Sequence, residues 1–188
     1  MGFGEYIANS NTKLLLHFNG NSNDGSGNGN NGTDTNITYS NTQGKFGKGI
    51  LVTNPGRIDV GNNSSLNVNA PMTISAWAYP ANTNGGIIIC RNYNWLVSAS
   101  FQYCLFILSS KMRFTPTTTP VDDAYSTTAM SLNAWHHLCV TIDSSYNGKF
   151  YLDGQADGTF IKRNQTQNYS TLIASRRAAN SSVFLRYA

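Results

Sequence analysis

Two adjacent histidines, His136 and His137, are the first residues in this sequence that suggest a chemical site. Trp135 and Cys139 stand beside them and aspartates follow downstream, so the group has the composition of a metal-binding or acid–base cluster. Whether the two imidazoles act together depends on the element that carries them. On a β-strand, neighbouring side chains point to opposite faces, and the two histidines would then be unable to bind one ion together.

The segment 135–142, WHHLCVTI, is predicted to be such a strand. Alternation places its even-numbered residues on a core face with the first histidine at the rim, and its odd-numbered residues, with the second histidine, on the opposite face. Residues 143–148 are predicted to form a hairpin turn and 149–153 the returning strand, which ends in an Asp153-Gly154 turn of type I′. Both histidines are therefore predicted to be structural rather than catalytic.

Short apolar runs separated by Asn, Gly, Ser, Pro and Asp recur along the chain, and no stretch shows the period of an amphipathic helix. The runs are 13–18, 49–52, 57–60, 72–79, 86–90, 95–98, 103–108, 111–114, 135–142, 149–153 and 158–162. Because 188 residues are enough for one domain, the sequence predicts an all-β fold, a two-sheet antiparallel β-sandwich or jelly roll.

The charge pattern and the lengths of the apolar stretches argue against two classes of partner, nucleic acids and membranes. Charged residues make up 12% of the chain, and the net charge of +4 is scattered along it. A nucleic-acid partner is not expected, because such a protein needs a clustered basic face. No apolar stretch is long enough for a membrane span or a secretory signal, so no membrane partner is expected and synthesis in a cytoplasm is the default.

The three cysteines, Cys90, Cys104 and Cys139, each lie in an apolar run, and none belongs to a Cys-x-x-Cys motif. A disulfide framework or a zinc knuckle is therefore not expected. The cysteines are predicted to be small buried hydrophobic residues.

The segment 18–33, FNGNSNDGSGNGNNGT, is predicted to be a loop, because Gly and Asn tolerate left-handed backbone. It is not a phosphate cradle, since no helix follows it. Asn19 and Asp24 offer oxygen atoms of the kind that calcium prefers, but a single carboxylate would bind the ion weakly. The first prediction is an ordered loop that requires no cofactor; a calcium site at Asn19 and Asp24 is the alternative.

The segment 91–98, RNYNWLVS, is the best candidate for a ligand site. Tyr93 and Trp95 could stack on a sugar ring, and the amide of Asn94 could bind its hydroxyl groups. Tyr103 is a weaker candidate of the same kind. The alternative is that Trp95 opens a strand and packs in the core.

Several segments together resemble the laminin-G-like, concanavalin A-like lectin/glucanase jelly roll. They are LLLHFNGNSNDGSGNGNNGT (14–33), GKFGKGILV (44–52), PMTISAWAYP (71–80) and WHHLCVTIDSSYNGKFYLDGQADG (135–158). The resemblance implies two stacked antiparallel sheets in one domain at 13–188, with residues 1–12 as an N-terminal arm. It also implies recognition of glycans or other surfaces without catalysis, and structural roles for Trp77 and Trp135.

The sequence departs from the family pattern at two places. Members often carry an acid at the position of Asn19, and an amide there weakens the case for calcium. The family also commonly ends in a strand that includes acidic residues, whereas 171–188 lacks them and stops early. We therefore expect a last strand that is either missing or exchanged with another subunit.

The related fold also occurs in glucanases, which need two carboxylates facing each other across the substrate. The nine acids here form no alternating acidic strand, and Asp122 and Asp123 are adjacent, so that a strand would point them apart. A G-x-S-x-G nucleophile motif is also absent. The sequence predicts a protein that is not an enzyme.

The first functional prediction is a non-catalytic structural or decoration protein of a phage capsid or tail, made in the host cytoplasm and displayed on the virion surface. It rests on the lectin-like resemblance, the low charge, the absence of a secretion signal and the incomplete last strand. Its expected partners are a capsid or tail scaffold protein, copies of itself and, as a further partner, glycans. The alternative is a free carbohydrate-binding module or adhesin at the bacterial surface or outside the cell.

Overall fold

The structure is a computed structural model that describes residues 6–91, 102–115, 123–161, 171–173 and, for the backbone, 185–186. The strands are β1 (Thr33–Ser40), β2 (Gly49–Asp59), β3 (Met72–Ala78), β4 (Gly86–Arg91), β5 (Tyr103–Leu108), β6 (Lys111–Thr115), β7 (Ala124–Tyr125), β8 (His136–Ile142), β9 (Asn147–Leu152), β10 (Gln155–Ile161), β11 (Thr171–Ile173) and β12 (Leu185–Arg186). Two short 3₁₀ turns, η1 (Asn41–Gln43) and η2 (Ser64–Leu66), lie in the connections.

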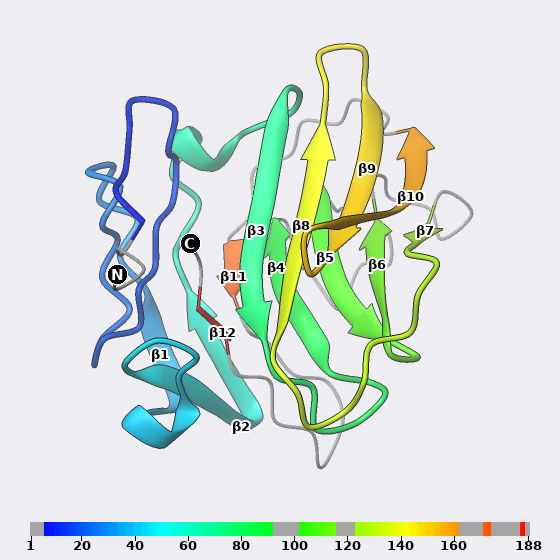
Figure 1. The fold of residues 1–188 in the computed structure, drawn as a ribbon. Coiled ribbons are helices and arrows are strands. Elements are labelled where there is room, and N and C mark those ends of the chain that lie inside the picture. The colour runs from blue at the N-terminus through cyan, green and yellow to red at the C-terminus, as the bar shows by residue number, and fades with distance from the viewer. Residues whose placement is uncertain (1–5, 92–101, 116–122, 162–170, 174–184, 187–188) are drawn as a thin grey trace.

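The strands form two antiparallel sheets stacked face to face (Figure 1). One sheet has seven strands in the order β1-β2-β11-β4-β5-β6-β7, and the other has five in the order β10-β9-β8-β3-β12. The predicted all-β two-sheet sandwich is confirmed. No helix in the described part of the chain has the length and apolar character needed to cross a membrane.

The core lies between the sheets and follows the two-residue period of the strands. In β8, His136, Leu138, Val140 and Ile142 are buried, and the residues between them are half-buried on the outward face. His136 and His137 therefore point to opposite faces, as predicted. The reason is the pleat of the strand, which fixes the direction of every side chain once one face is buried.

The turns around β9 also agree with the prediction. Asp143 accepts backbone hydrogen bonds from Ser145 and Asn147 in the turn between β8 and β9. After β9, Asp153 and Gly154 both have positive φ, 51° and 82°, as a type I′ turn requires.

Two segments at the start of the domain differ from the prediction. The apolar run 13–18 is not a strand; its Leu16 makes one isolated bridge with Asp24. Strand β1 was not predicted, because its residues are mostly exposed or half-buried at the edge of a sheet and so form no apolar run.

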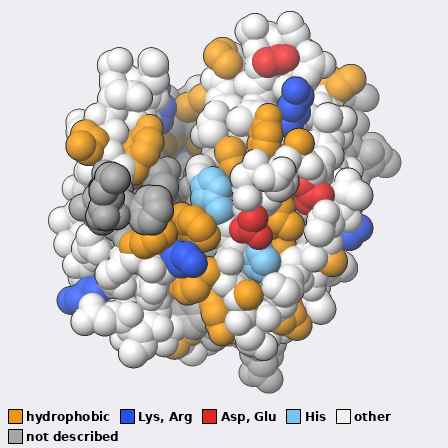
Figure 2. Space-filling model, viewed as in Figure 1, with side chains coloured by type: hydrophobic (Ala, Val, Ile, Leu, Met, Phe, Trp, Pro, Cys, Tyr) orange, Lys and Arg blue, Asp and Glu red, His pale blue; other side chains and the backbone are white. Residues whose placement is uncertain are grey.

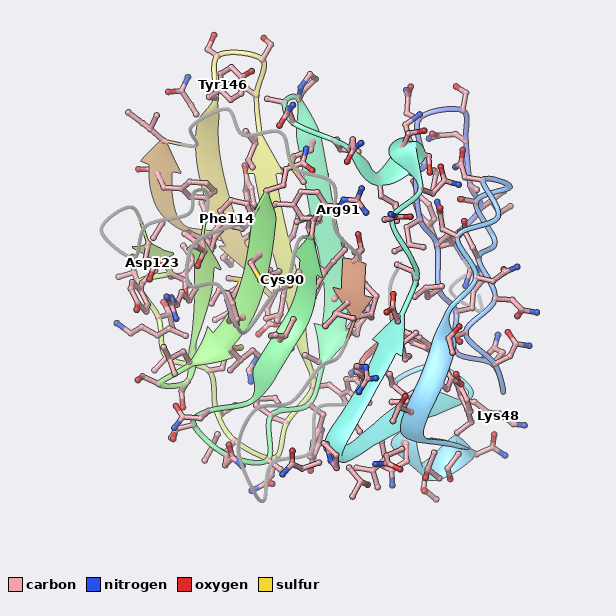
Figure 3. The ribbon with its side chains drawn as sticks, turned by 180° about the vertical axis from the view of Figure 1, so that it is seen from behind. Lys48, Cys90, Arg91, Phe114, Asp123 and Tyr146 are labelled. Carbon is pink, nitrogen blue, oxygen red and sulfur yellow. A yellow bond between two sulfur atoms is a disulfide. The ribbon has the colours of Figure 1, made fainter. Side chains whose placement is uncertain are left out.

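The prediction for the cysteines was wrong for two of the three. A disulfide joins Cys90 of β4 to Cys104 of β5, which are direct partners in the antiparallel register (Figure 3). Both residues are fully buried, which agrees with the predicted apolar surroundings. The disulfide itself depends on the alignment of two strands. Cys139 is unpaired and half-buried.

The fully buried Arg91 ties the end of β4 to the loop that leads into β3 (Figure 3). Its guanidinium donates to five oxygens, namely the carbonyls of Gly61, Asn62 and Asn63, Asn67 Oδ1 and Thr171 Oγ1. These acceptors are all neutral, and burial lowers the pKa of the guanidinium. Arg91 is therefore a structural clamp on loop 61–67.

Candidate functional site

The outward face of the five-stranded sheet carries aromatic and polar side chains, which alternate along the strands with the buried core residues. On β3 these are Ser75 and Trp77, and on β8 they are His137 and Cys139. The register sets Trp77 opposite His137 and Ser75 opposite Cys139. Figure 2 shows hydrophobic and histidine side chains gathered over this face, beside a hollow.

Trp77 is the centre of an aromatic patch, which we define as Lys45, Phe46, Trp77 and His137. The Trp77 ring lies 5.6 Å from Phe46 in an edge-to-face arrangement and 5.1 Å from the tilted ring of His137. The Lys45 ammonium lies 5.1 Å from the Trp77 ring centroid. Phe46 is 39% exposed, so the patch offers apolar surface and one cation to the solvent.

The structural roles predicted for Trp77 and Trp135 stay a prediction, and the structure places both rings outside the core. Trp77 alternates with the buried residues of β3, so its ring lies on the outward face. Trp135 precedes β8 and packs on Tyr79 at 5.7 Å, and both rings are half-buried. The period of MTISAWAY could have revealed this, since Trp77 shares its parity with Thr73 and Ser75 rather than with Ile74 and the alanines.

Ser75 and His137 form a hydrogen-bonded pair on this face, with Ser75 Oγ 2.7 Å from His137 Nε2. Burial lowers the pKa of the imidazole, so the ring is neutral at neutral pH. Ser75 nevertheless lies within a regular paired strand, not on the sharp strand-to-helix turn that exposes a nucleophilic serine beside oxyanion donors. The pair fixes the ring that supports Trp77.

His136 lies between Ser131 and Asp153, and this Ser-His-Asp row resembles the catalytic triad of hydrolases. Its Nε2 is 2.9 Å from Ser131 Oγ, and its Nδ1 is 2.7 Å from Asp153 Oδ2. The same Nε2 lies 3.1 Å from the Ser131 carbonyl oxygen, which can only accept a hydrogen bond. The contacts of His136 with Ser131 and Asp153 join the loop before β8 to the turn after β9, and we interpret the row as part of the scaffold.

A groove of about 860 Å³ opens between the N-terminal segment and β3. Asn9, Asn11, Thr12 and Lys13 form one wall, and residues 71–75 form the other. Core residues line its floor, and His137 and Cys139 lie where it meets the outward face. Residues 6–12, the described part of the predicted N-terminal arm, thus include one wall of this groove.

Three of the four residues predicted to bind a ligand, Tyr93, Asn94 and Trp95, lie outside the described residues. Tyr103 is described, and it is not an exposed stacking ring as predicted. It is 3% exposed at the floor of the groove, and its hydroxyl donates to the Leu66 carbonyl oxygen at 3.0 Å. The desolvation raises the pKa of Tyr103 to about 12.

The predicted calcium ligand Asp24 lies in the loop between the N-terminal segment and β1. Its carboxylate accepts hydrogen bonds from the backbone N–H groups of Leu15, Ser26 and Asn30 and from Ser26 Oγ. Four donors already occupy the lone pairs that a cation would need. Within the described residues, no three His, Cys, Asp or Glu side chains gather as metal ligands, and calcium at Asn19 and Asp24 stays a prediction.

The chain resembles solved structures of toxin binding domains. The binding domain of Paraclostridial Mosquitocidal Protein 1 matches with a TM-score of 0.71 and 16% identity, over 88% of this chain and 44% of that chain. The binding domain of Botulinum Neurotoxin DC in complex with SialylT matches with a TM-score of 0.68 and 18% identity, over 95% and 47%. At such identities the likeness shows the fold, and this chain spans less than half of either structure.

A comparison with curated protein sequences gives no match. A laminin G family model, described as the concanavalin A-like lectin/glucanases superfamily, matches residues 53–185, which is more than half of the chain. The matched region includes β3 to β11 and the turn held by Asp153. The chain therefore belongs to the concanavalin A-like lectin/glucanase superfamily.

Proposed function

We propose that the chain is a non-catalytic recognition module that binds glycans through the aromatic patch. The observation that carries the proposal is the gathering of Phe46, Trp77 and Lys45 on the outward face of the five-stranded sheet. Sugar rings present C–H groups that stack on aromatic faces, and their hydroxyl groups accept hydrogen bonds from cations. The patch supplies both kinds of contact.

The rigidity of the patch favours binding, because fewer side chains lose freedom when a ligand arrives. Trp77 is held by Phe46 and His137, and His137 is held in turn by Ser75. The backbone N–H of His137 also donates to Asp153 at 2.8 Å. Residues of two strands, a loop and a turn therefore fix the central ring before a glycan binds.

Similar structures support a role in binding. One was solved with SialylT, and another concerns the interaction of botulinum neurotoxin type C with two ganglioside molecules, with a TM-score of 0.65 and 17% identity over 93% of this chain and 46% of that chain. Those ligands belong to those proteins. For this chain, they motivate a test with sialylated and neutral glycans.

The arrangement of the acids supports a role without catalysis. Each described aspartate accepts a hydrogen bond within a turn, a loop or a neighbouring strand, and examples are Asp59, Asp123 and Asp157. A glycosidase needs two carboxylates that face the same bond of the substrate. Within the described residues, the triad-like row of His136 joins the loop before β8 to the turn after β9.

A glycan array probed with the full chain tests the proposal. Phe46→Ala should weaken binding about tenfold, since loss of one stacking contact costs about 1.4 kcal/mol. Tyr125→Ala is the matched control, because Tyr125 is a similarly exposed aromatic residue, at 46%, on the seven-stranded sheet. Equal binding by both variants, or no glycan bound by the wild type, would contradict the proposal.

The site predicted from the sequence, Tyr93, Asn94 and Trp95, remains an alternative location for the glycan. Trp95→Ala distinguishes the two sites on the same array. If Trp95→Ala abolishes binding and Phe46→Ala does not, the function stands and the aromatic patch is the wrong site.

The disulfide supports a setting outside a reducing cytoplasm. Disulfides persist in secreted proteins and on cell and virion surfaces, and Cys90–Cys104 lies in the sheet interior. We therefore propose display at a surface, and the phage capsid or tail predicted from the sequence remains one such setting beside the bacterial surface. Mass spectrometry of purified particles tests the virion setting, which requires the chain in a fixed ratio to the capsid or tail scaffold protein.

A further inference from the structure

The loop 44–48, GKFGK, leads from η1 into β2 and carries two residues of the aromatic patch, Lys45 and Phe46. Its backbone folds closely on itself. A side chain at Gly44 would collide with the Gly47 carbonyl oxygen, and one at Gly49 would collide with the Gln43 carbonyl oxygen. Because only glycine fits at both positions, the loop has a compact base from which the two exposed side chains project over the sheet.

The Lys45 ammonium lies against aromatic rings and not against an acid. It is 5.1 Å from the Trp77 ring centroid and 6.0 Å from that of Phe46, and Figure 2 shows a basic side chain against the hydrophobic ones of this face. None of the ion pairs formed among the described residues includes Lys45. A contact with the face of a ring leaves the N–H groups of an ammonium available to an acceptor from solvent.

The other ionisable groups of this face leave the charge of Lys45 in place. Burial lowers the pKa of His137, so its ring is neutral at neutral pH. Asp153 accepts from the His137 backbone N–H and lies against the His136 imidazole. It follows β9, so that β8 stands between it and the β3 strand of Trp77. The face therefore has a positive end at Lys45 and a negative end at Asp153.

We propose that Lys45 makes the patch selective for glycans in which a sugar carries a carboxylate group. This inference rests on the proposed glycan site and names the class of sugar that it takes. The carboxylate accepts hydrogen bonds from the Lys45 ammonium while a face of the sugar ring stacks on Phe46. The Asp153 charge repels a carboxylate, so the sugar is oriented with its hydroxyl groups toward that end.

Matched pairs of glycans that differ only in this charge are the first test. Sialyllactose is compared with its methyl ester, and a disaccharide of glucuronic acid is compared with its methyl ester. In at least one pair, the full chain should bind the acid about fivefold more tightly than the ester, as expected for one exposed ion pair. The pair that shows the preference distinguishes a sialic acid from a uronic acid. Equal affinity for acid and ester in both pairs would overturn the proposal.

Variants separate the charge at position 45 from the net charge of the chain. Lys45→Gln should remove the preference for the acid and leave binding of the ester unchanged, which also shows that the variant is folded. Lys45→Arg should keep the preference, since arginine retains the charge. Lys48→Gln is the matched control, because Lys48 belongs to the same loop but lies beside Gly20 at the margin of the molecule (Figure 3). An equal loss in both glutamine variants would contradict a specific role for Lys45.

Ionic strength gives an independent measurement. A rise from about 0.01 M to about 1 M salt shortens the screening length from about 30 Å to about 3 Å. The affinity of the wild type for the acid should fall toward that of Lys45→Gln, whereas its affinity for the ester should change little. An affinity for the acid that salt leaves unchanged would count against the ion pair.

Failure of this inference is distinguishable from failure of the glycan site itself. If neutral glycans bind the wild type, depend on Phe46 and gain nothing from a carboxylate, the selectivity is wrong and the proposed function stands. If no glycan binds the wild type, both proposals are wrong.

Discussion

Asp153 connects both histidines of the segment WHHLC. Its Oδ1 accepts from the His137 backbone N–H at 2.8 Å, and its Oδ2 lies 2.7 Å from His136 Nδ1. The same residue adopts a left-handed φ of 51° in the turn after β9. One aspartate thus sets the turn and orients both histidines, as the predicted structural role requires.

Replacing Asp153 tests this role. Asp153→Asn should keep the left-handed turn but lose the charged partner of His136, which would lower the free energy of unfolding by about 1 kcal/mol. Asp153→Ala should cost about 2 kcal/mol or more, because alanine also disfavours positive φ. Urea unfolding measures both variants, and an alanine variant as stable as the wild type would contradict the assignment.

His137 should make the stability depend on pH. Burial lowers its pKa, although the Asp153 charge acts in the opposite direction. In the unfolded chain, the imidazole therefore binds a proton at about pH 6.5, whereas in the folded chain it binds one only at a lower pH. The free energy of unfolding should therefore be highest above this pH and should decrease as the pH falls toward the folded pKa.

The measurement for this prediction is the urea midpoint between about pH 7 and pH 5. The urea midpoint of the His137→Gln variant should fall less over this pH range than that of the wild type, because glutamine does not titrate. An identical decline in both proteins would show that other groups dominate the dependence.

At the scale of elements, β4 and β5 are joined by both pairing and the disulfide. Cys90 and Cys104 are 14 residues apart in sequence, and removal of a bridge that closes a loop of this size costs about 3 kcal/mol. Cys90→Ser with Cys104→Ser should therefore lower Tm, and a reducing agent should do the same to the wild type.

Cys139→Ser is the control for the disulfide, since this variant should stay sensitive to the reductant. Alkylation of the unfolded, unreduced chain should label one thiol, that of Cys139. Labelling of all three thiols in protein from an oxidising compartment would contradict the bridge.

The loop around Asp24 is the element on which the calcium alternative depends. The Asp24 carboxylate accepts four hydrogen bonds within the loop. We therefore expect Asp24→Asn to destabilise the loop whether or not calcium is present. Addition of millimolar calcium to metal-free wild type should leave Tm within about 1 °C, because a site with one carboxylate is weak. A larger rise that Asp24→Asn removes would establish the calcium site instead.

At the scale of the whole molecule, the two sheets form a scaffold that carries the proposed glycan-binding patch on an outer face. The superfamily includes glucanases, so absence of hydrolysis is a prediction about the entire chain. Incubation with β-glucans should release no reducing ends above the level of a protein-free control. Release that persists after purification to homogeneity would contradict the assignment.

Local sequence patterns were sufficient to predict the class of fold and the direction of many side chains. The period of WHHLCVTI separates His136 from His137, and the Asp153-Gly154 pair specifies its turn, because pleat and turn geometry are local properties. The same local logic places Trp77 on the outward face, because it shares the parity of Thr73 and Ser75 rather than that of Ile74.

Contacts between residues that are distant in the sequence depend on how the strands are ordered and stacked. Cys90 faces Cys104 because β4 and β5 pair in one register, and Phe46 reaches Trp77 from a loop far away in the sequence. The groove along β3 depends on the N-terminal segment lying opposite an edge. These contacts arise from strand order and sheet stacking, which alternation within a single strand does not encode.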